Sequence, residues 1–338
     1  MNQVKLKHIF QIDETAGIPK YKQIISSVYK AIEQGNLKKG DKIPSLNEIC
    51  QSFDLSRDTV MVALNELKAR GVVSSVPGKG YYIDSTALDY EKRIFVLFDE
   101  LNVFKEDLYN SFTSQLDNKT SVDIYFHHFN FKLFEKLVTE AAGKYSAYVI
   151  MPATFDDTYQ VIRHLPNDKV YILDREKTDL EEYPVIYQDF EQDVVDALTD
   201  GKDLLEKYDK LVMHFPGGKE PEGRIDGFKR FCEDNKIDYE VIYSLSNRKV
   251  RKGEAYLVMS DRNLVRMVKK AALEGLTLGV DLGLVSFNDT VLKEVVAGGI
   301  TTISTDFRLM GETLAELVER RKTGKLRNPS ALIRRNSL

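Results

Sequence analysis

Three segments near the N-terminus carry hydrophobic residues at helical spacing, and they cover residues 21–32, 46–53 and 60–67. This spacing predicts helices that each bury one face. Pro19 and Gly35 delimit the first segment, while Ser45, with Glu48 three residues later, forms a capping box before the second. Ser56 can cap the third helix. Because only a tight turn separates the last two segments, the pattern predicts a helix-turn-helix.

After the third helix the pattern changes to two short extended runs, residues 72–76 and 81–83. The turn between them, residues 77–80, reads Pro-Gly-Lys-Gly. Such runs around a glycine-rich turn predict a β-hairpin. A hairpin in this position is the wing of a winged helix. We therefore expect a winged helix-turn-helix of mixed α+β structure in residues 1–84.

The remainder of the chain alternates short apolar runs with amphipathic helical segments. A first series of runs covers residues 94–98, 122–126, 148–151 and 170–173, and a second covers 185–187, 211–214, 239–243, 255–259 and 282–286. Strand and helix patterns that alternate in this way predict βαβ units, with parallel sheets covered by helices on both faces. We therefore expect a multi-domain protein with a polar hinge at 85–91 and two α/β lobes in residues 92–338.

Composition places the chain among ordinary globular proteins. Of its 338 residues, 43% are hydrophobic and 30% charged, which excludes collagenous and wholly disordered classes. The longest apolar runs are far shorter than the ~20 residues that cross a bilayer, and the N-terminus has no apolar core of a signal peptide. We therefore expect a cytoplasmic protein without a membrane partner. Cys50 and Cys232 lack C-x-x-C spacing, so no redox chemistry is implied.

The net charge of −4 conceals an asymmetry along the chain. Residues 1–84 hold twelve Lys and Arg against nine Asp and Glu, whereas residues 85–338 hold 36 against 43. A short basic segment joined to a larger acidic one is typical of a nucleic-acid-binding module with a separate regulatory body, because phosphate binding is largely electrostatic.

A winged helix-turn-helix places its third helix in the major groove of DNA. The exposed start of that helix and the tip of the wing supply the candidate DNA-contacting residues, which are Ser56, Arg57, Asp58, Thr59, Gly78, Lys79 and Gly80. Arg57 suits a bidentate pair with guanine or phosphate, and the glycines beside Lys79 allow the backbone to approach DNA closely. The alternative is that Arg57 and Lys79 are ordinary solvated surface charges.

Five motifs resemble, in sequence and spacing, the GntR family of bacterial winged-helix regulators: Pro19 to Ile24, Gly40 to Ser45, Leu55 to Val60, Ala63 to Leu67 and Gly78 to Gly80. The resemblance covers about residues 10–84 and implies a DNA-binding domain, with Ser45 and Asn47 as further candidates for DNA contact. The family commonly has arginine where Asn47 and Met61 stand. Fewer cationic contacts imply weaker nonspecific binding or a different operator.

The larger segment lacks the usual catalytic and cofactor motifs. Residues 97–101, after the first predicted strand, contain no glycine for a dinucleotide-binding loop, and Gly217-Gly218-Lys219 lacks the spacing of a phosphate-binding loop. The five histidines have no metal-ligand spacing, and no G-x-S-x-G is present. We therefore expect no catalytic residue, metal ion or cofactor.

Open α/β sheets bind ligands at the carboxyl ends of their strands. The residues that follow predicted strands there, or open a helix beside them, are Phe98, Asp99, Phe126, Asp174, Asp189, Arg224, Ser260, Asp261, Asn288 and Asp289. Carboxylates, an amide, a guanidinium and aromatic rings suit a neutral polyhydroxylated ligand, which means a sugar. The alternative is that Asp174, Asp261 and Asp289 cap the helices that follow.

A second resemblance covers about residues 92–338, carried by Ile172 to Arg175, Gly223 to Phe228, Met259 to Asp261, Val285 to Asp289 and Leu332 to Ser337. These motifs resemble the lac-repressor-type effector domain, which is related to periplasmic sugar-binding proteins. The resemblance implies that Arg224 and Asn288 contact an effector sugar, and that Asp99 and Ser260 line its site. Ser286 stands where glycine is usual, and residues 244–253 are too short for the expected helix.

Together the two halves resemble the arabinose-repressor subgroup of GntR regulators. This implies a sugar-responsive regulator that binds a pseudo-palindromic operator on double-stranded DNA as a homodimer. The sequence leaves open which sugar acts, and whether it releases or promotes DNA binding. Two alternatives remain: a GntR regulator fused to an aminotransferase-like body, and a sugar-processing enzyme with an N-terminal interaction module.

Overall fold

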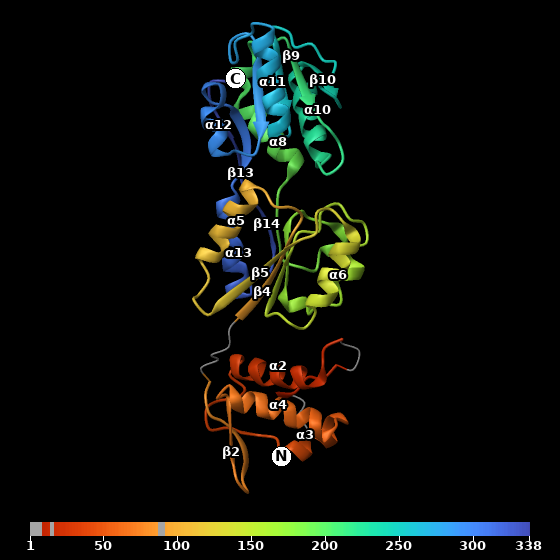
Figure 1. The fold of residues 1–338 in the computed structure, drawn as a ribbon, viewed down its shortest axis with the longest axis vertical. Helices are drawn as coiled ribbons and strands as arrows, with labels where there is room; N and C mark the ends of the chain where they lie inside the picture. The colour runs from red at the N-terminus through yellow and green to blue at the C-terminus, as the bar shows by residue number, and fades with distance from the viewer. Residues whose placement is uncertain (1–8, 14–16, 87–91) are drawn as a thin grey trace.

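The computed structural model describes residues 9–13, 17–86 and 92–338. Most of the predicted hinge, residues 87–91, lies outside the described residues, as do residues 1–8 and 14–16 of the predicted winged helix. Figure 1 shows three bodies in a row along the long axis of the chain. We call them the N-terminal module (the described residues up to 86), lobe 1, which lies in the middle, and lobe 2, which carries the C-terminus.

The N-terminal module packs helices against an antiparallel sheet with the strand order β1-β3-β2. Its elements are α2 (Lys20–Glu33), α3 (Leu46–Phe53), α4 (Arg57–Ala69), β1 (Lys42–Ile43), β2 (Val73–Val76) and β3 (Gly80–Ile83). The predicted helix-turn-helix and wing are therefore confirmed. Strand β1 was not predicted, because two residues are too few to show a period-two pattern.

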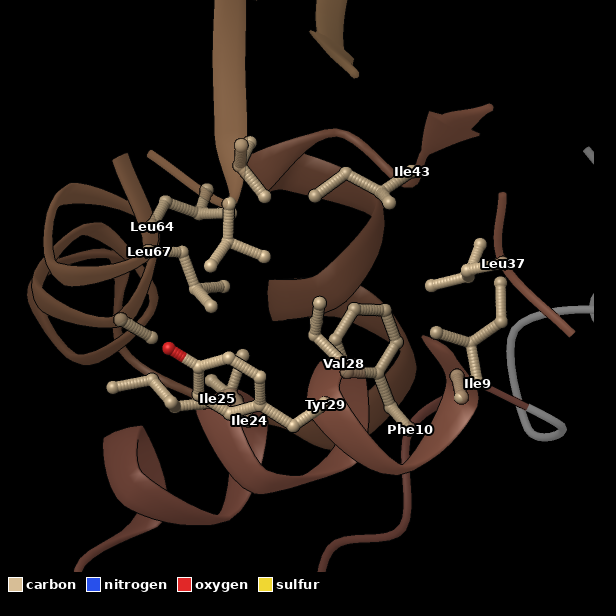
Figure 2. Close-up of a cluster of buried hydrophobic side chains, with 14 of the residues drawn as sticks. Ile9, Phe10, Ile24, Ile25, Val28, Tyr29, Leu37, Ile43, Leu64 and Leu67 are labelled. Carbon is tan, nitrogen blue, oxygen red and sulfur yellow. The ribbon is translucent and has the colours of Figure 1, made fainter. Parts of the chain in front are cut away.

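Figure 2 shows the hydrophobic core of this module, in which side chains from the segment before α2, from α2 and from α4 come together. Ile24 and Val28 of α2 and Leu64 and Leu67 of α4 are all 0% exposed. Burying each such side chain contributes roughly 1.5–3 kcal/mol. This packing holds one face of α4 against the module and leaves its opposite face to solvent.

Lobe 1 is a six-stranded parallel sheet in the order β14-β8-β7-β6-β4-β5. Its strands are β4 (Lys92–Phe98), β5 (Thr120–Phe126), β6 (Ala147–Ile150), β7 (Val170–Asp174), β8 (Val185–Tyr187) and β14 (Lys325–Arg327). Its helices are α5 (Val103–Ser114), α6 (Phe131–Ala141), α7 (Thr158–Ile162) and α13 (Phe307–Arg320), with short 3-10 turns η1 (Asn167–Lys169) and η2 (Thr178–Leu180). Ile94 and Val96 of β4 pack with α5 and α13, whereas Phe95 and Leu97 pack with α6 and α7. Helices therefore cover both faces (Figure 1).

Lobe 2 is a second six-stranded sheet, in the order β10-β9-β11-β12-β13-β15, with only β15 antiparallel. Its strands are β9 (Lys210–His214), β10 (Asp238–Ile242), β11 (Glu254–Val258), β12 (Gly283–Phe287), β13 (Thr301–Thr305) and β15 (Ser330–Ile333). Its helices are α8 (Phe190–Asp200), α9 (Lys202–Leu205), α10 (Gly223–Asn235), α11 (Asp261–Leu273) and α12 (Val291–Val295), with the 3-10 turn η3 (Val296–Gly298). Leu257 packs with α8 and α10, and its neighbour Tyr256 packs with α11 on the opposite face.

The prediction that residues 185–187 begin the second lobe is wrong. They form β8, which pairs in parallel with β7 and belongs to lobe 1. An apolar run predicts a strand, but its partner strand depends on residues far away in the sequence. The chain enters lobe 2 after β8, returns to lobe 1 after β13 for α13 and β14, and crosses a third time before β15.

The three crossing segments hydrogen-bond to one another. The Thr305 hydroxyl donates to Gln188 Oε1 (2.5 Å), which joins the first crossing to the second. The Asn328 side-chain amide donates to the carbonyl oxygen of Asp306 (3.0 Å), which joins the third crossing to the second. The lobes are therefore connected through one hydrogen-bonded hinge.

Residues 244–253 contain no helix, as the length of this segment indicates. Arg248 holds the segment in place by donating to Glu240 (2.9 Å), Glu254 (2.8 Å) and the Tyr256 hydroxyl (3.0 Å). An ion-pair and hydrogen-bond cluster therefore takes over the anchoring that a packed helix would supply.

Helix α13 crosses α5 closely at Gly311. A Cβ on Gly311 would lie 2.8 Å from the backbone nitrogen of Phe112 and would also meet the carbonyl oxygen of Leu108. Because both neighbours are backbone atoms, no change of rotamer relieves the overlap. We expect Gly311→Ala to lower the free energy of unfolding by about 2 kcal/mol in urea titrations, although alanine is the better helix former. Glu312→Ala, at an exposed position of the same helix, is the control, and an equal midpoint for both variants would contradict the close crossing.

Candidate functional site

The exposed start of α4 carries four of the nine predicted DNA-contacting residues, Ser56, Arg57, Asp58 and Thr59. Ser56 caps the helix by accepting from the Thr59 N–H (3.2 Å), and both Arg57 and Asp58 are exposed. Arg57 Nη1 donates to Asn47 Oδ1 at the start of α3 (3.2 Å). The amide of Asn47 therefore positions the guanidinium of Arg57, and no carboxylate among the described residues forms an ion pair with it within 4.0 Å.

Ser45 has a structural role at the start of α3. Its backbone N–H donates to Glu48 Oε2 (2.7 Å), and its hydroxyl accepts from the Glu48 N–H (3.4 Å), so the predicted capping box is confirmed. The hydrogen bond from the backbone of Ser45 lowers the pKa of Glu48. The cap fixes the direction in which α3 starts, and with it the place of Asn47.

The tip of the wing depends on its two glycines. Gly78 and Gly80 have φ angles of 72° and 112°, in the region that L-residues with a side chain rarely adopt. Lys79 between them is exposed. A Cβ on Gly80 would lie 3.1 Å from Cε of Lys42, so a second exposed lysine lies beside the wing. The wing thus presents positive charge close to its backbone.

Lys105 is the centre of a buried charge cluster in lobe 1. Its Nζ lies 3.0 Å from Asp99 Oδ1 and 3.8 Å from Asp174 Oδ1, and all three residues are buried. Burial by itself lowers the pKa of Lys105, but the charges of Asp174 and Asp99 outweigh burial and raise it. The lysine is therefore charged, and it brings two of the predicted ligand-binding carboxylates together.

Arg224 is the corresponding buried charge of lobe 2. It is 7% exposed, and its Nη1 donates to Glu220 Oε2 (3.0 Å). Its Cζ lies 4.5 Å from the ring centroid of Phe287 and 5.5 Å from that of Phe190. Burial lowers the pKa of Arg224, whereas Glu220 opposes this shift. Two aromatic rings and one carboxylate therefore fix the guanidinium in place.

The first crossing segment connects these two clusters. Gln188 donates to Asp174 Oδ1 (2.6 Å) in lobe 1. Two residues later, Phe190 places its ring 5.0 Å from Cζ of Arg175 as well as beside Arg224. Residues 188–190 therefore contact charged groups of both lobes.

Lys293, a second buried cation in lobe 2, holds other predicted residues together. Its Nζ lies 3.0 Å from Asp261 Oδ1 and donates to the carbonyl oxygen of Asn288 (2.5 Å). Asn288 has a φ of 58°, a conformation that asparagine tolerates better than most residues. Asp289, the next residue, forms a bidentate ion pair with Arg335 (2.6 and 2.8 Å).

The alternative explanation of three aspartates as helix caps is wrong. Ser260 caps α11, so Asp261 is the first helical residue. Asp289 precedes α12, whose N-cap residue makes no side-chain cap, and Asp174 lies in the charge cluster of Lys105. The only predicted acid that caps a helix among the described residues is Asp189, which accepts from the third residue of α8 (3.1 Å).

Phe98 and Phe126 belong to the core of lobe 1. Phe98 is 1% exposed and packs with α5 and α13, and Phe126 packs against the same core. The Phe98 ring centroid is 5.9 Å from the Nζ of Lys105, so this ring supports the charge cluster. The aromatic rings beside the buried arginine are Phe190 and Phe287.

An ion pair joins the two lobes across the cleft. Lys219, which follows β9, places its Nζ 2.6 and 2.5 Å from the two carboxylate oxygens of Glu100, which follows β4. Arg175 also donates to the carbonyl oxygen of Lys219 (3.4 Å). The side chains of Lys219 and Glu100 are 46% and 29% exposed, so the pair contributes only about 0–1 kcal/mol. The lobes are in contact here, but this weak ion pair does not prevent a change in the angle between them.

A cavity of about 480 Å³ opens beside Arg175, and of the ten predicted ligand-binding residues its lining contains Asp189. Its lining includes Arg175, Gln188 and Asp189 of lobe 1 and the first crossing, together with Phe190 and Gly223 at the starts of α8 and α10. Pockets for small molecules typically measure about 300–1,000 Å³. The volume and the mixture of polar and aromatic groups are suitable for a ligand of the size of a sugar.

Sequence reasoning missed several residues of this site: Lys105, Gln188, Phe190, Glu220 and Lys293. For Lys105 a signal was present, because it shares the buried stripe of α5 with Leu108 and Phe112, three and seven residues later. A lysine on an apolar stripe needs a buried carboxylate partner. Glu220 precedes Arg224 by four residues, but it lies before the start of α10, so helical spacing does not reveal the pair.

Two buried histidines near the strand ends make stability depend on pH. Burial lowers the pKa values of His127 and His214, so below the unfolded value of about 6.5 the unfolded chain binds more protons. Stability is therefore full above about pH 6.5 and falls by at most about 1.4 kcal/mol per pH unit for each histidine below it.

We expect urea titrations at pH 7.5 and 5.5 to show this loss, and His127→Gln or His214→Gln to reduce it. His164→Gln, at an exposed position, is the control and retains the full loss. A loss of equal size in all four proteins would assign the effect to other groups.

Within the ranges that the structure describes, no three His, Cys, Asp or Glu side chains come together as metal ligands. Over the same ranges, none of the helices has both the length and the apolar character needed to span a membrane.

Two family models match separate parts of the chain. Residues 20–83 match the family model of bacterial regulatory proteins of the gntR family, and residues 208–337 match that of the periplasmic binding protein-like domain. The arabinose metabolism transcriptional repressor of Geobacillus stearothermophilus is 38% identical over 66 residues, which are 20% of this chain and 18% of that protein. Across the curated relatives, the matched segment spans between 13% and 61% of their length.

Solved structures show the same fold over the larger part of the chain. A dimeric Lac repressor superimposes with a TM-score of 0.60 at 19% identity, covering 72% of this chain and 98% of that one. A periplasmic binding protein/LacI transcriptional regulator from Alkaliphilus metalliredigens, complexed with D-xylulofuranose, gives a TM-score of 0.59 at 14% identity over 73% and 98% of the two chains. The chain therefore joins an N-terminal region that matches the gntR family of bacterial regulatory proteins to a two-lobed fold, of which residues 208–337 match the periplasmic binding protein-like domain.

Proposed function

We propose that this chain is a transcriptional repressor that binds operator DNA through its N-terminal module and releases it when a sugar occupies the site between the lobes. In this proposal residues 1–84 are the DNA-binding domain, 85–91 the hinge and 92–338 the sensor. The proposal is supported by the gntR match over 20–83, by the repressor names of relatives, and by the sugar complex of one structural neighbour.

The observation that carries the sugar proposal is the balance of charge in the inter-lobe site. Lys105 faces Asp99 and Asp174, Arg224 faces Glu220, and Arg175 Nε lies 3.9 Å from Asp174 Oδ2. Lys105 and Arg224 each face a carboxylate at 3.0 Å, and only Arg175 keeps an Nε without a hydrogen-bond partner, so a phosphorylated ligand finds little unbalanced positive charge among these residues. A neutral polyol can accept from the guanidinium, donate to the carboxylates and place its apolar face on a ring.

The hydrogen-bonded crossings between the lobes, together with the ion pair that joins the lobes, indicate how occupancy of the sugar site can be transmitted to the N-terminal module. A sugar held by both lobes changes the angle between them at the hydrogen-bonded crossings. Lobe 1 is the body next to the N-terminal module, and Arg321 at the end of α13 forms an ion pair with Glu33 of α2 (3.0 Å). Shifting a two-state equilibrium from 1:99 to 99:1 requires about 5.5 kcal/mol of differential binding, which two sugars per dimer share.

A homodimer is proposed because each winged helix reads one half of a symmetric operator. Exposed apolar side chains support it: Val291, Leu292 and Val295 of α12 are 76%, 69% and 70% exposed, and Leu101 and Val103 near the start of α5 are 66% and 57% exposed. Figure 1 places α12 and α5 on the same side of the two lobes. A symmetric contact along this side buries these residues in both copies.

Leu292→Glu should therefore convert the dimer into a monomer, because it places a charge in an apolar contact. Sedimentation velocity at micromolar concentration measures the change. Tyr243→Glu is the control, since Tyr243 is 67% exposed and follows β10, on the opposite side of lobe 2 from α12 in Figure 1. If the Leu292→Glu variant remains a dimer, the dimer interface does not include α12.

The test of the whole proposal uses the full chain and a duplex that carries the DNA upstream of its own coding sequence. We expect affinity to fall steeply as salt rises from 50 to 200 mM, because DNA binding releases counterions. A thermal-shift screen over monosaccharides identifies the effector, since 100 Kd of ligand stabilises the protein by about 2.7 kcal/mol. The identified sugar should then release the duplex. Absence of salt-dependent binding to any duplex would overturn the proposal.

The two alternative functions make other predictions. Residues 92–338 have the two-lobed fold of the Lac repressor and of periplasmic binding protein-like domains, which is not the fold of an aminotransferase-like body. A sugar-processing enzyme predicts turnover of the sugar that stabilises the protein, and chromatography of that sugar after incubation distinguishes it from a sensor.

A further inference from the structure

Helix α4 has an exposed stripe whose middle residue is apolar. Asp58, Val62 and Asn65 are exposed and lie at the spacing of one helix face. Val62 is 49% exposed, whereas Val60 and Leu64 on the inner face are 0% exposed. Valine is a poorer helix former than alanine, and at this position it adds nothing to the core. The stripe therefore contains a branched apolar side chain without a packing role.

We propose that Val62 reads the C5-methyl group of a thymine in the major groove of the operator. This inference rests on the proposed function and names what one part of the DNA-binding surface recognises. In the major groove of unmodified DNA, thymine is the only base that presents a methyl group, and apolar side chains discriminate it by direct contact. The 49% exposure of Val62 makes its two methyl groups available for that contact.

The neighbours of Val62 favour a base over the DNA backbone as its partner. Asp58, one turn earlier on the same stripe, carries a negative charge that disfavours phosphate and suits the amino group of cytosine. Arg57, held by Asn47, suits guanine. Positive charge suited to phosphate lies instead on Lys79 at the tip of the wing and on Lys42 of β1 beside it. The exposed stripe of α4 is therefore suited to contact base edges, whereas the wing is suited to contact the phosphates of the DNA backbone.

Helix geometry sets the expected spacing within each half-site. Val62 follows Arg57 by five residues, which at 1.5 Å per residue is about 7.5 Å along the axis of α4. With base pairs about 3.4 Å apart, the thymine read by Val62 lies within about three base pairs of the guanine read by Arg57.

The test replaces single thymines of the operator by deoxyuridine, which removes only the C5-methyl group. The full chain first selects its operator from a random duplex pool, and fluorescence anisotropy then gives Kd for each substituted duplex. We expect one thymine per half-site at which deoxyuridine weakens binding about fourfold, the effect of losing one buried methyl contact. Val62→Ala should weaken binding by a similar factor at each half-site, which is about 16-fold for the dimer, and should lose sensitivity to deoxyuridine at that position alone.

Val265→Ala is the matched control, because Val265 is 43% exposed but lies on α11 of lobe 2. It should retain both the affinity and the deoxyuridine effect of the unaltered chain. If Val62→Ala keeps the same deoxyuridine effect at every thymine, or if no thymine shows an effect, the inference is overturned while the proposed function stands. If the unaltered chain selects no duplex at all, both fail together.

Discussion

Replacing Arg224 by alanine is expected to raise the sugar concentration needed for operator release at least about 30-fold, while operator affinity without sugar stays unchanged. Arg224 is 7% exposed, paired with Glu220 and flanked by Phe287 and Phe190. Truncating a buried, hydrogen-bonded charge typically costs about 2–5 kcal/mol in binding, because its partner is left unpaired. Operator titrations with increasing sugar measure the effect, and the N-terminal module is untouched by the substitution.

Loss of folding must be separated from loss of sugar binding in this experiment. Arg224→Ala leaves Glu220, whose side chain is 13% exposed, as a largely buried charge without its partner, which by itself destabilises lobe 2. The double variant Arg224→Met with Glu220→Gln removes both charges and keeps similar volumes, so it should fold and still ignore the sugar. Arg224→Lys keeps the charge but loses the planar stacking group and should respond only at higher sugar concentration. A full sugar response in the folded double variant would place the effector elsewhere.

Arg57→Ala is expected to weaken operator binding by about 1–3 kcal/mol for each half-site. The residue is exposed at the start of α4, and the side chain that accepts its hydrogen bond, Asn47, is uncharged. The positive charge of Arg57 therefore remains available to DNA. Anisotropy titrations over a range of salt measure both affinity and its salt dependence. A guanine contact relaxes sequence specificity when it is removed, whereas a phosphate contact lowers the salt slope by about one for each site.

Arg70→Ala provides the matched control at the other end of α4. Arg70 is exposed and forms an ion pair with Glu66 (2.6 Å), so its charge is partly satisfied within the helix. We expect little change in operator affinity for this variant. Asn47→Ala should lie between the two, because it frees the Arg57 side chain from its positioning contact. Equal affinities for Arg57→Ala and Arg70→Ala would count against α4 as the recognition helix.

The sequence predicts the local elements of this fold well. Patterns at Val60 to Leu67 and at Ile94 to Phe98 identify α4 and β4 because side-chain periodicity is a property of neighbouring residues. The capping box of Ser45 and Glu48 is equally local, and the structure contains it. Residues 185–187 show the limit, since their pattern predicts a strand without indicating that it pairs with β7.

The candidate site likewise combines features that the sequence predicts with contacts that it does not. The order of residues is sufficient to predict the winged helix, the alternation that builds two α/β lobes, and the polar residues near the strand ends, including Asp99, Asp174 and Arg224. The contacts of Lys105 with the two aspartates and of Phe190 with both lobes become visible in the folded chain alone. The reason is physical: periodicity and capping depend on residues a few positions apart, whereas pairing of buried charges depends on which segments the sheets and crossings bring together.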